Sequence, residues 1–170
     1  SYTFTMTEYN IPENVKRAAN APTTFPSQFT ELPPFPVRPG PDNDVYDLAT
    51  SITEGKNTDY EKAEAIMYYL RNNYYYNING TLTPQGDDFV DYFLFGNDGI
   101  DGKCTNFASA FTVLSRLNGI PTRYVEGNGP GEVITPEGWQ NSGYGDSTGY
   151  QIEEDTRIIT MLNGHAYAEV

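Results

Sequence analysis

The sequence predicts an α+β domain in which helices come first along the chain and strands follow. Apolar residues recur every three or four positions in residues 43–54, 58–73 and 104–117, as they do in helices with a buried face. Residues 165–170 alternate between large and small side chains instead, which is typical of a strand. A chain of 170 residues is long enough for one domain with a hydrophobic core.

The composition is strongly acidic, and this excludes some partners. There are 23 Asp and Glu residues against 10 Lys and Arg, which gives a formal charge of −13 and a pI near 4.2. Phosphate backbones and anionic lipid surfaces would repel such a chain, so nucleic acid is not an expected partner. No apolar run approaches the ~18 residues of a membrane span. We therefore expect membrane attachment only through parts outside this stretch.

The sequence predicts no cofactor and no metal site. It has no Cys/His spacing for zinc and no glycine-rich phosphate loop. The acidic residues between positions 87 and 101 do not fit the spacing of an EF-hand loop. A solvated acidic rim is the favoured interpretation of these residues, and calcium binding stays open.

Residues 1–41 are predicted to form an N-terminal segment that precedes the main domain at residues 42–170. Residues 1–9 alternate aromatic or methionine side chains with threonine, which predicts a strand. Residues 11–41 hold eight of the 12 prolines, too many for a helix or a central strand. We expect this Pro-rich part to be an extended arm that lies along the domain.

Two helices are expected after the arm, in residues 43–54 and 58–73. Gly55 follows the first helix as its stop, and Thr58 with Glu61 matches a capping box at the start of the second. The buried stripe of the second helix is predicted to be Ala63, Ile66, Met67 and Leu70. Next we expect a strand in residues 74–78 and a short aromatic helix in residues 86–96.

The only cysteine, Cys104, is predicted to lie at the first turn of a buried helix. Gly102 is expected to supply backbone freedom for the preceding turn, and the helix should end at Asn118 and Gly119. The first N–H groups of a helix have no partner within it, so its start carries partial positive charge. A thiolate is stabilised at such a position. The alternative is a cysteine that serves only as core packing.

The only histidine, His165, is the natural partner for this thiol. It begins the alternating segment 165–170, and strands are also expected in residues 121–127 and 151–161, with a long loop at 128–149. One cysteine at a helix start and one histidine at a strand start are the minimum for a thiolate–imidazolium pair. The pattern indicates a candidate nucleophile and its base.

With this pair placed, the chain resembles the transglutaminase-like superfamily, whose core is papain-like. The likeness is greatest to the membrane-anchored transglutaminase-like proteins of bacteria and archaea. It is carried by Gly102-Lys103-Cys104, by Phe107-Ala108-Ser109-Ala110, by residues 114–127 and by Gly164-His165-Ala166-Tyr167-Ala168-Glu169-Val170. The resemblance implies a central nucleophile helix packed on an antiparallel sheet. It also implies an extracytoplasmic location.

The resemblance further implies a Cys–His–Asp triad with Cys104 as nucleophile and His165 as base. The aspartate would lie on a following strand, beyond Val170, so we expect this stretch alone to be weakly active or inactive unless Glu169 substitutes. The implied reaction is attack of the thiolate on an amide of a protein or peptide, either a glutamine side chain or a peptide bond. Water would complete hydrolysis, and an amine acceptor would complete crosslinking. An acidic cleft rim would favour cationic acceptors.

Three aromatic residues are candidates for the cleft. Tyr76 is the candidate side-chain donor to the oxyanion, beside the Cys104 backbone N–H, and Trp139 and Tyr144 are candidates for lining the acyl-donor cleft. Arg123 is assigned a structural role, bracing the acidic loops from within. The alternative function is a non-catalytic extracytoplasmic module that binds peptide or wall polymer on the same fold, and a purely structural spacer would not need Cys104 at all.

Overall fold

The computed structural model describes residues 10–32, 44–80, 82–96, 101–129, 132–135, 137–138, 157–158 and 164–170. The chain divides into two compact units, and each is described by itself: Ser1–Tyr124 with Ala168–Val170, and Val125–Tyr167. In chain order the elements are α1 (Glu13–Arg17), η1 (Ser27–Phe29), α2 (Asp44–Thr53), α3 (Asp59–Asn73), β1 (Tyr75–Tyr76), α4 (Phe89–Asp91), η2 (Tyr92–Gly96), β2 (Asp101–Gly102), α5 (Cys104–Leu117), β3 (Arg123–Asn128), β4 (Glu132–Val133), β5 (Arg157–Ile158) and β6 (Gly164–Glu169).

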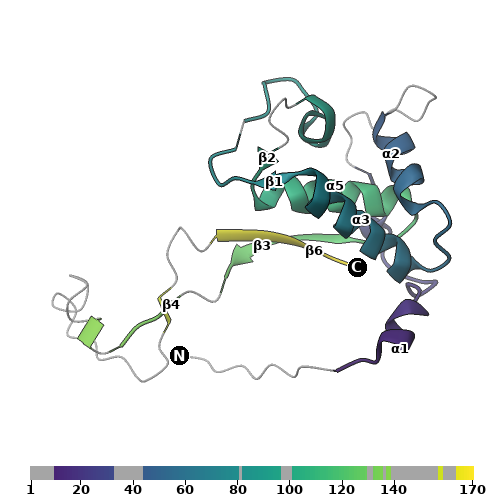
Figure 1. The fold of residues 1–170 in the computed structure, drawn as a ribbon, viewed down its shortest axis with the longest axis horizontal. Helices are drawn as coiled ribbons and strands as arrows, with labels where there is room; N and C mark the ends of the chain where they lie inside the picture. The colour runs from purple at the N-terminus through teal and green to yellow at the C-terminus, as the bar shows by residue number, and fades with distance from the viewer. Residues whose placement is uncertain are drawn as a thin grey trace. The chain divides into compact units, whose positions relative to one another are not determined.

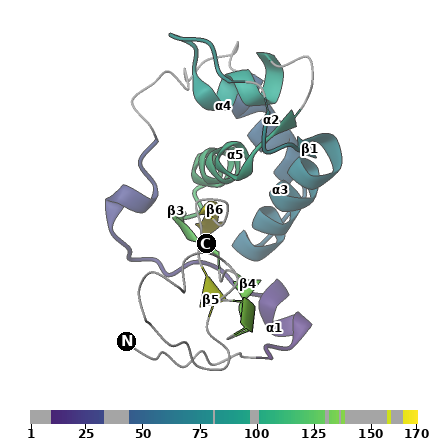
Figure 2. The ribbon, with the colours of Figure 1, turned by 90° about the vertical axis from the view of Figure 1, so that its left-hand side faces the viewer.

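The core of the first unit lies where three helices, α2, α3 and α5, pack against one another (Figures 1 and 2). Each helix contributes the apolar face that its sequence spacing predicts. The buried cluster consists of Val45, Ala49, Ile66, Leu70, Tyr74, Val90, Phe93, Leu94, Ala110, Val113 and Leu114. The expected α+β fold with a buried cysteine helix is therefore confirmed.

The boundaries of α2 and α3 follow from local stop and start signals. Gly55 has a φ of 74°, a conformation that glycine adopts without strain, and it follows the last turn of α2. The Glu61 N–H donates to Thr58 Oγ1 at 3.2 Å, as expected for an N-cap, whereas the Glu61 carboxylate accepts from the Asn57 N–H at 3.0 Å. The predicted capping residue Thr58 is thus confirmed, whereas the reciprocal half of the capping box was wrong, because Glu61 accepts from Asn57 and not from Thr58.

One residue of the predicted α3 stripe was wrong. Ala63, Ile66 and Leu70 are buried, but Met67 is 43% exposed. Met67 follows Ile66 directly, and successive residues are about 100° apart around a helix. The buried stripe of α3 is narrower than the sequence suggested, and Met67 lies at its border.

The predicted aromatic helix is divided into α4 and a π-helical turn, η2. Asp88 caps α4, because its Oδ1 accepts hydrogen bonds from the N–H groups of Val90 at 3.0 Å and Asp91 at 2.8 Å. Phe93 and Leu94 of η2 are buried in the core cluster. The acidic residue at position 88 therefore has a structural role at a helix start.

The Pro-rich arm contains short helices, so the expectation that its prolines exclude helix was wrong. Pro12 and Pro26 directly precede α1 and η1, where a missing N–H costs nothing because no helical partner exists for it. Hydrogen bonds join the arm to later parts of the chain, from the Tyr60 N–H to Ala19 O at 3.2 Å and from the Thr122 N–H to Phe29 O at 2.8 Å. Residues 1–9 and 33–43 lie outside the described residues.

The described strands form three two-stranded pairs. β1 pairs with β2 in parallel, β3 pairs with β6, and β4 pairs with β5 in antiparallel fashion. Each of the strands expected at 74–78, 121–127, 151–161 and 165–170 overlaps an observed strand, and β4 lies inside the segment expected to be a loop. Within the described residues, no helix has the length and apolar character needed to cross a bilayer.

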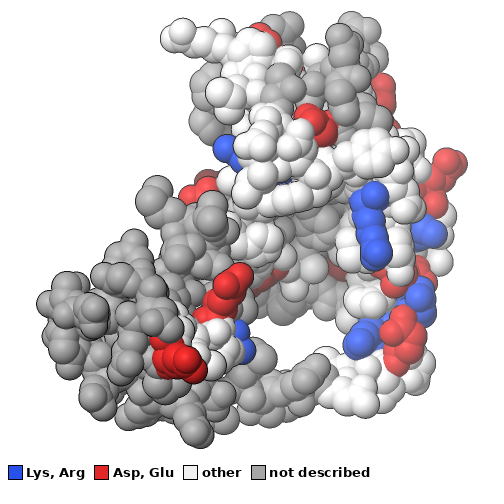
Figure 3. Space-filling model, turned by 60° about the vertical axis from the view of Figure 1, so that its left-hand side comes forward, with Lys and Arg blue, Asp and Glu red and all other residues white. Residues whose placement is uncertain are grey.

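Acidic and basic side chains lie close together on part of the face drawn in Figure 3. Arg17 of α1 shows how such charges pair, since it contacts Glu13 and Glu64 at 3.1 Å each. These pairs are exposed, and pairs of this kind contribute little to stability.

Candidate active site

Cys104 is the first residue of α5, as predicted, and it is half-buried. The preceding residue, Lys103, is the N-cap, and its N–H donates to Asn106 Oδ1 at 3.1 Å. Asn106 is only 6% exposed, so this hydrogen bond fixes the turn that carries the thiol. From the sequence Asn106 was taken for a polar residue on the helix surface, which was wrong, because the pair Lys103 and Asn106 lacks the Ser/Thr and Glu/Gln by which a capping box is found.

The start of α5 presents two N–H groups that no acceptor in the described residues satisfies. The N–H groups of Asn106 and Phe107 donate to Lys103 O at 2.9 and 3.3 Å. The N–H groups of Cys104 and Thr105 meet no acceptor within the described parts of the chain. Free N–H groups at a helix start favour negative charge. The site therefore suits a thiolate on Cys104 or an oxyanion beside it.

Gly102 is required for a reason that differs from the one expected. Its backbone is not in the left-handed region, where Gly55, Gly86 and Gly119 lie, so conformational freedom is not what it supplies. A Cβ at Gly102 would lie 2.7 Å from Phe93 Cε2 and 2.8 Å from Asn106 Cβ. The missing side chain lets β2 approach the start of α5 closely.

Tyr76 lies beside the start of this helix. Its strand partner in β2 is Gly102, two residues before Cys104, and its ring centroid is 6.4 Å from that of Phe107 in α5. The Tyr76 side chain is 61% exposed. The parallel β1–β2 pair is thus what brings this predicted oxyanion donor to the start of α5.

Aromatic side chains pack against the first turns of α5. The Phe93 ring lies 5.2 Å from Phe107 and 4.8 Å from Tyr74, measured between centroids. The Tyr74 hydroxyl donates to Leu94 O at 3.0 Å, and burial raises the pKa of this phenol well above its ordinary value. The first turns of α5 therefore rest on a fixed aromatic cluster.

His165 is the second residue of β6 and its side chain is exposed. It belongs to the second compact unit, whereas Cys104 belongs to the first. The ring of Tyr167 is stacked against His165, with centroids 6.3 Å apart and planes at 21°. The buried residue between them, Ala166, confirms the alternation that the sequence predicted.

Arg123 links β3 to β6 on the protein surface, and it does not lie in the interior of the protein as predicted. Its guanidinium is exposed, and it forms an ion pair and two hydrogen bonds with the Glu169 carboxylate. The structural role predicted for Arg123 is thus found on the surface of the strand pair. Trp139 and Tyr144 lie outside the described residues.

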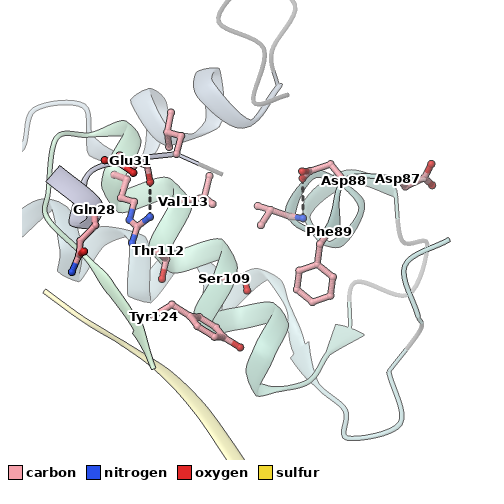
Figure 4. Close-up of a pocket in the computed structure, with 12 residues that line it drawn as sticks. Gln28, Glu31, Asp87, Asp88, Phe89, Ser109, Thr112, Val113 and Tyr124 are labelled. Atoms are coloured by element: carbon pink, nitrogen blue, oxygen red, sulfur yellow. Dashed lines mark hydrogen bonds between the residues drawn. The ribbon is translucent and has the colours of Figure 1, made fainter. Parts of the chain in front are cut away.

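A cavity of about 480 Å³ lies along one face of α5, and we call it the α5 trough. In Figure 4 Ser109, Thr112 and Val113 rise from α5, with Phe89 and Asp88 on one side and Gln28 and Glu31 on the other. Its lining is Gln28, Glu31, Leu32, Asp87, Asp88, Phe89, Val90, Ser109, Thr112, Val113, Arg116 and Tyr124. Cys104 is not among these residues, so the trough is separate from the thiol.

The cation in the trough is already engaged. Arg116 donates from Nε and Nη2 to Thr122 O at 3.1 and 2.7 Å, and from Nη1 to Glu31 O. Burial lowers the pKa of Arg116, and the nearby Glu31 opposes this change. The sequence did not predict the trough, because its walls come from four separate segments of the chain.

Cys104 is a half-buried thiol at the start of a buried helix, and the histidine of this α+β domain follows on a later strand. This arrangement is typical of the papain-like class of cysteine-dependent proteins. The family model of the transglutaminase-like superfamily matches residues 46–170, and the chain belongs to this family. Members of this superfamily are in general cysteine enzymes, and the fold is consistent with cysteine-dependent acyl transfer.

Two known proteins are similar to the chain. The uncharacterized protein YebA of Bacillus subtilis (strain 168) is 32% identical over 150 residues, which cover 86% of this chain and 18% of that protein. The crystal structure of the periplasmic domain of TgpA from Pseudomonas aeruginosa matches with a TM-score of 0.60 and 20% identity, over 92% of this chain and 43% of that one. The chain spans less than half of either relative, and the TgpA likeness concerns the fold alone.

Proposed function

We propose that the chain carries the thiol chemistry of an acyltransferase or hydrolase that acts on amides. The observation that carries this proposal is the position of Cys104 at the first residue of α5, next to N–H groups that have no acceptor in the described residues. Membership of the transglutaminase-like superfamily supports it. Cys104 is the nucleophile and His165 the acid–base residue.

In the proposed reaction the Cys104 thiolate attacks the amide carbonyl carbon, and a C–S bond forms. The C–N bond breaks as the His165 imidazolium gives its proton to the leaving nitrogen, which leaves an acyl-thioester on Cys104. Water or an amine then attacks the thioester, the imidazole takes the proton from the attacking group, and the thiolate is released. The carbonyl oxygen carries negative charge in each step and is met by the Cys104 N–H and the Tyr76 hydroxyl.

The orienting carboxylate of the triad is proposed to come from a strand that follows β6, as the family pattern implies. Glu169 is a poor substitute, because Arg123 already engages its carboxylate. Within the described residues the His165 side chain has no hydrogen-bond partner. Since an orienting acid contributes strongly to such triads, we expect turnover to depend on this carboxylate.

The proposed substrate is an amide of a protein or peptide, with an amine as acceptor where transfer replaces hydrolysis. The net charge of −13 favours cationic acceptors. We propose an extracytoplasmic location, because the similar TgpA structure is that of a periplasmic domain. Trp139 and Tyr144 remain proposed cleft residues.

The second candidate is a binding module without catalysis, directed at peptide or wall polymer. The α5 trough favours it, because this cavity of about 480 Å³ does not involve Cys104. Its rim carries Glu31, Asp87 and Asp88 while the donors of Arg116 are engaged, so it suits a cationic side chain. A binding module would have no need of a reactive thiol, and this separates the two candidates.

The test is the rate at which iodoacetamide alkylates Cys104 near neutral pH, in the wild type and in His165→Ala. With a single cysteine, the mass change reports this site alone. We expect alkylation about tenfold or more faster than in the urea-unfolded chain, because only a thiolate reacts and the folded site stabilises it. We expect much of this gain to be lost in His165→Ala. Equal alkylation rates in the wild type and in His165→Ala would contradict the proposed thiolate–imidazolium pair and favour the binding module.

A further inference from the structure

The two aromatic side chains of β6, His165 and Tyr167, lie on the same face of the strand. They are two positions apart, and residues at this spacing point to the same side. Their ring centroids are 6.3 Å apart with an interplanar angle of 21°, which is the geometry of an offset stack. The tyrosine ring thus forms one wall for the imidazole.

Among the described residues, no hydrogen bond, ion pair or second ring contact restrains the imidazole. The His165 side chain is exposed and has no hydrogen-bond partner among the described residues. An exposed histidine would sample several staggered side-chain rotamers. A stacked neighbour removes the rotamers that separate the two rings, so the orientation of His165 depends on Tyr167.

The strand holds Tyr167 firmly enough for this role. The residue between the two rings, Ala166, is 4% exposed and packs on the opposite face. The strand β6 is also hydrogen-bonded to its neighbour β3. The backbone on either side of Tyr167 is therefore fixed, while its ring, 44% exposed, remains beside His165.

We propose that Tyr167 is a positioning residue that holds the His165 imidazole in one orientation for proton transfer. The stack itself stands on the geometry of β6, whereas its consequence for reaction rests on the proposed function. Tyr167 acts through its ring and not through its hydroxyl, because the observed interaction joins the two rings. Phenylalanine should therefore replace it and leucine should not.

The stack is tested by proton NMR of the imidazole in the full 170-residue chain. Because the chain has one histidine, its Hε1 and Hδ2 protons give a single pair of resonances. We expect Tyr167→Leu to move this pair toward the positions of free histidine and Tyr167→Phe to keep it near that of the wild type. Tyr68→Leu, which removes an exposed tyrosine of α3, is the matched control. An unchanged pair in Tyr167→Leu would overturn the stack.

The positioning role is tested by Cys104 alkylation in the same proteins. We expect Tyr167→Leu to slow alkylation by about two- to tenfold, the range that corresponds to an aromatic pair, and Tyr167→Phe to restore it. If Tyr167→Leu loses the stack but alkylates at the wild-type rate, the positioning role is wrong. If His165→Ala also reacts like the wild type, the proposed function fails, and the NMR result then concerns the stack alone.

Discussion

Replacing Gly102 with alanine tests the close packing at the start of α5. The added Cβ would lie 2.7 Å from Phe93 Cε2 and 2.8 Å from Asn106 Cβ, whereas carbon atoms in favourable contact are about 3.5–4.0 Å apart. Neither neighbour has room to move. Phe93 is 2% exposed within the aromatic cluster, and the Asn106 amide is held by the Lys103 N–H.

The expected cost follows from this crowding. Overpacking of a filled core destabilises by about 1–3 kcal/mol. With a dependence on urea of about 2 kcal/mol per molar, the midpoint of unfolding should fall by about 0.5–1.5 M while the slope stays the same. Gly102 directly precedes Lys103, the N-cap of α5, and Cys104 follows this N-cap. Alkylation of Cys104 in the folded protein should therefore also slow.

Gly127→Ala provides the matched control for this experiment. A Cβ at Gly127 meets nothing within 4 Å, and its backbone is not in the left-handed region. We expect its urea midpoint to stay within about 0.25 M of the wild type, as for a surface change. If Gly102→Ala unfolds at the same urea concentration as Gly127→Ala, the argument from close approach is refuted.

Two further predictions concern side chains that hold the helices. Thr58→Ala should lower the free energy of unfolding by about 1 kcal/mol through loss of the α3 cap. The control is Thr50→Ala, which changes an exposed threonine of α2, and an equal decrease in its free energy of unfolding would contradict the capping role of Thr58. Tyr74→Phe should cost about 1–2 kcal/mol, because Leu94 O loses its donor, whereas the exposed Tyr75→Phe should cost almost nothing in the same urea titration. Burial raises the pKa of Tyr74 in the folded state above the value of about 10 in the unfolded chain. The stabilisation from the protonated phenol is thus complete below about pH 10 and is lost as the pH rises further. The free energy of unfolding should therefore fall less steeply above about pH 10 in Tyr74→Phe than in the wild type. Parallel decreases in the two proteins would exclude Tyr74 as the source of this pH dependence.

The helices could be predicted from the sequence because their signals are local. Thr58, Gly55 and Gly119 each mark a helix end through a hydrogen bond or a backbone conformation that depends on a few neighbouring residues. The observed bounds of α2, α3 and α5 accordingly lie within one residue of those expected. The position of Cys104 at a helix start was predicted from the apolar spacing of residues 104–117, because the cap formed by Lys103 and Asn106 has no sequence signal of its own.

The remaining features depend on contacts between distant segments. Met67 was assigned to the core because spacing alone does not show how wide a buried face is. The need for a glycine at 102 was visible, but its cause became clear only from the position of Phe93. The stack of Tyr167 on His165 could have been found, since the alternation of residues 165–170 already placed both rings on one face.

The parallel pairing of β1 with β2 also separates the segment between the two strands, which can accept extra residues, from the helix that follows β2, which cannot. It anchors both ends of the excursion that leaves at Tyr76 and returns at Asp101. Within this excursion Gly86, at a φ of 101° and with open space around it, marks an outward turn. A tag or an inserted peptide at that turn would leave the β1–β2 pair beside Cys104 in place, whereas the next residue, Asp87, lines the α5 trough. The turn is therefore a practical place to attach a label when the thiol, and not the trough, is to stay undisturbed.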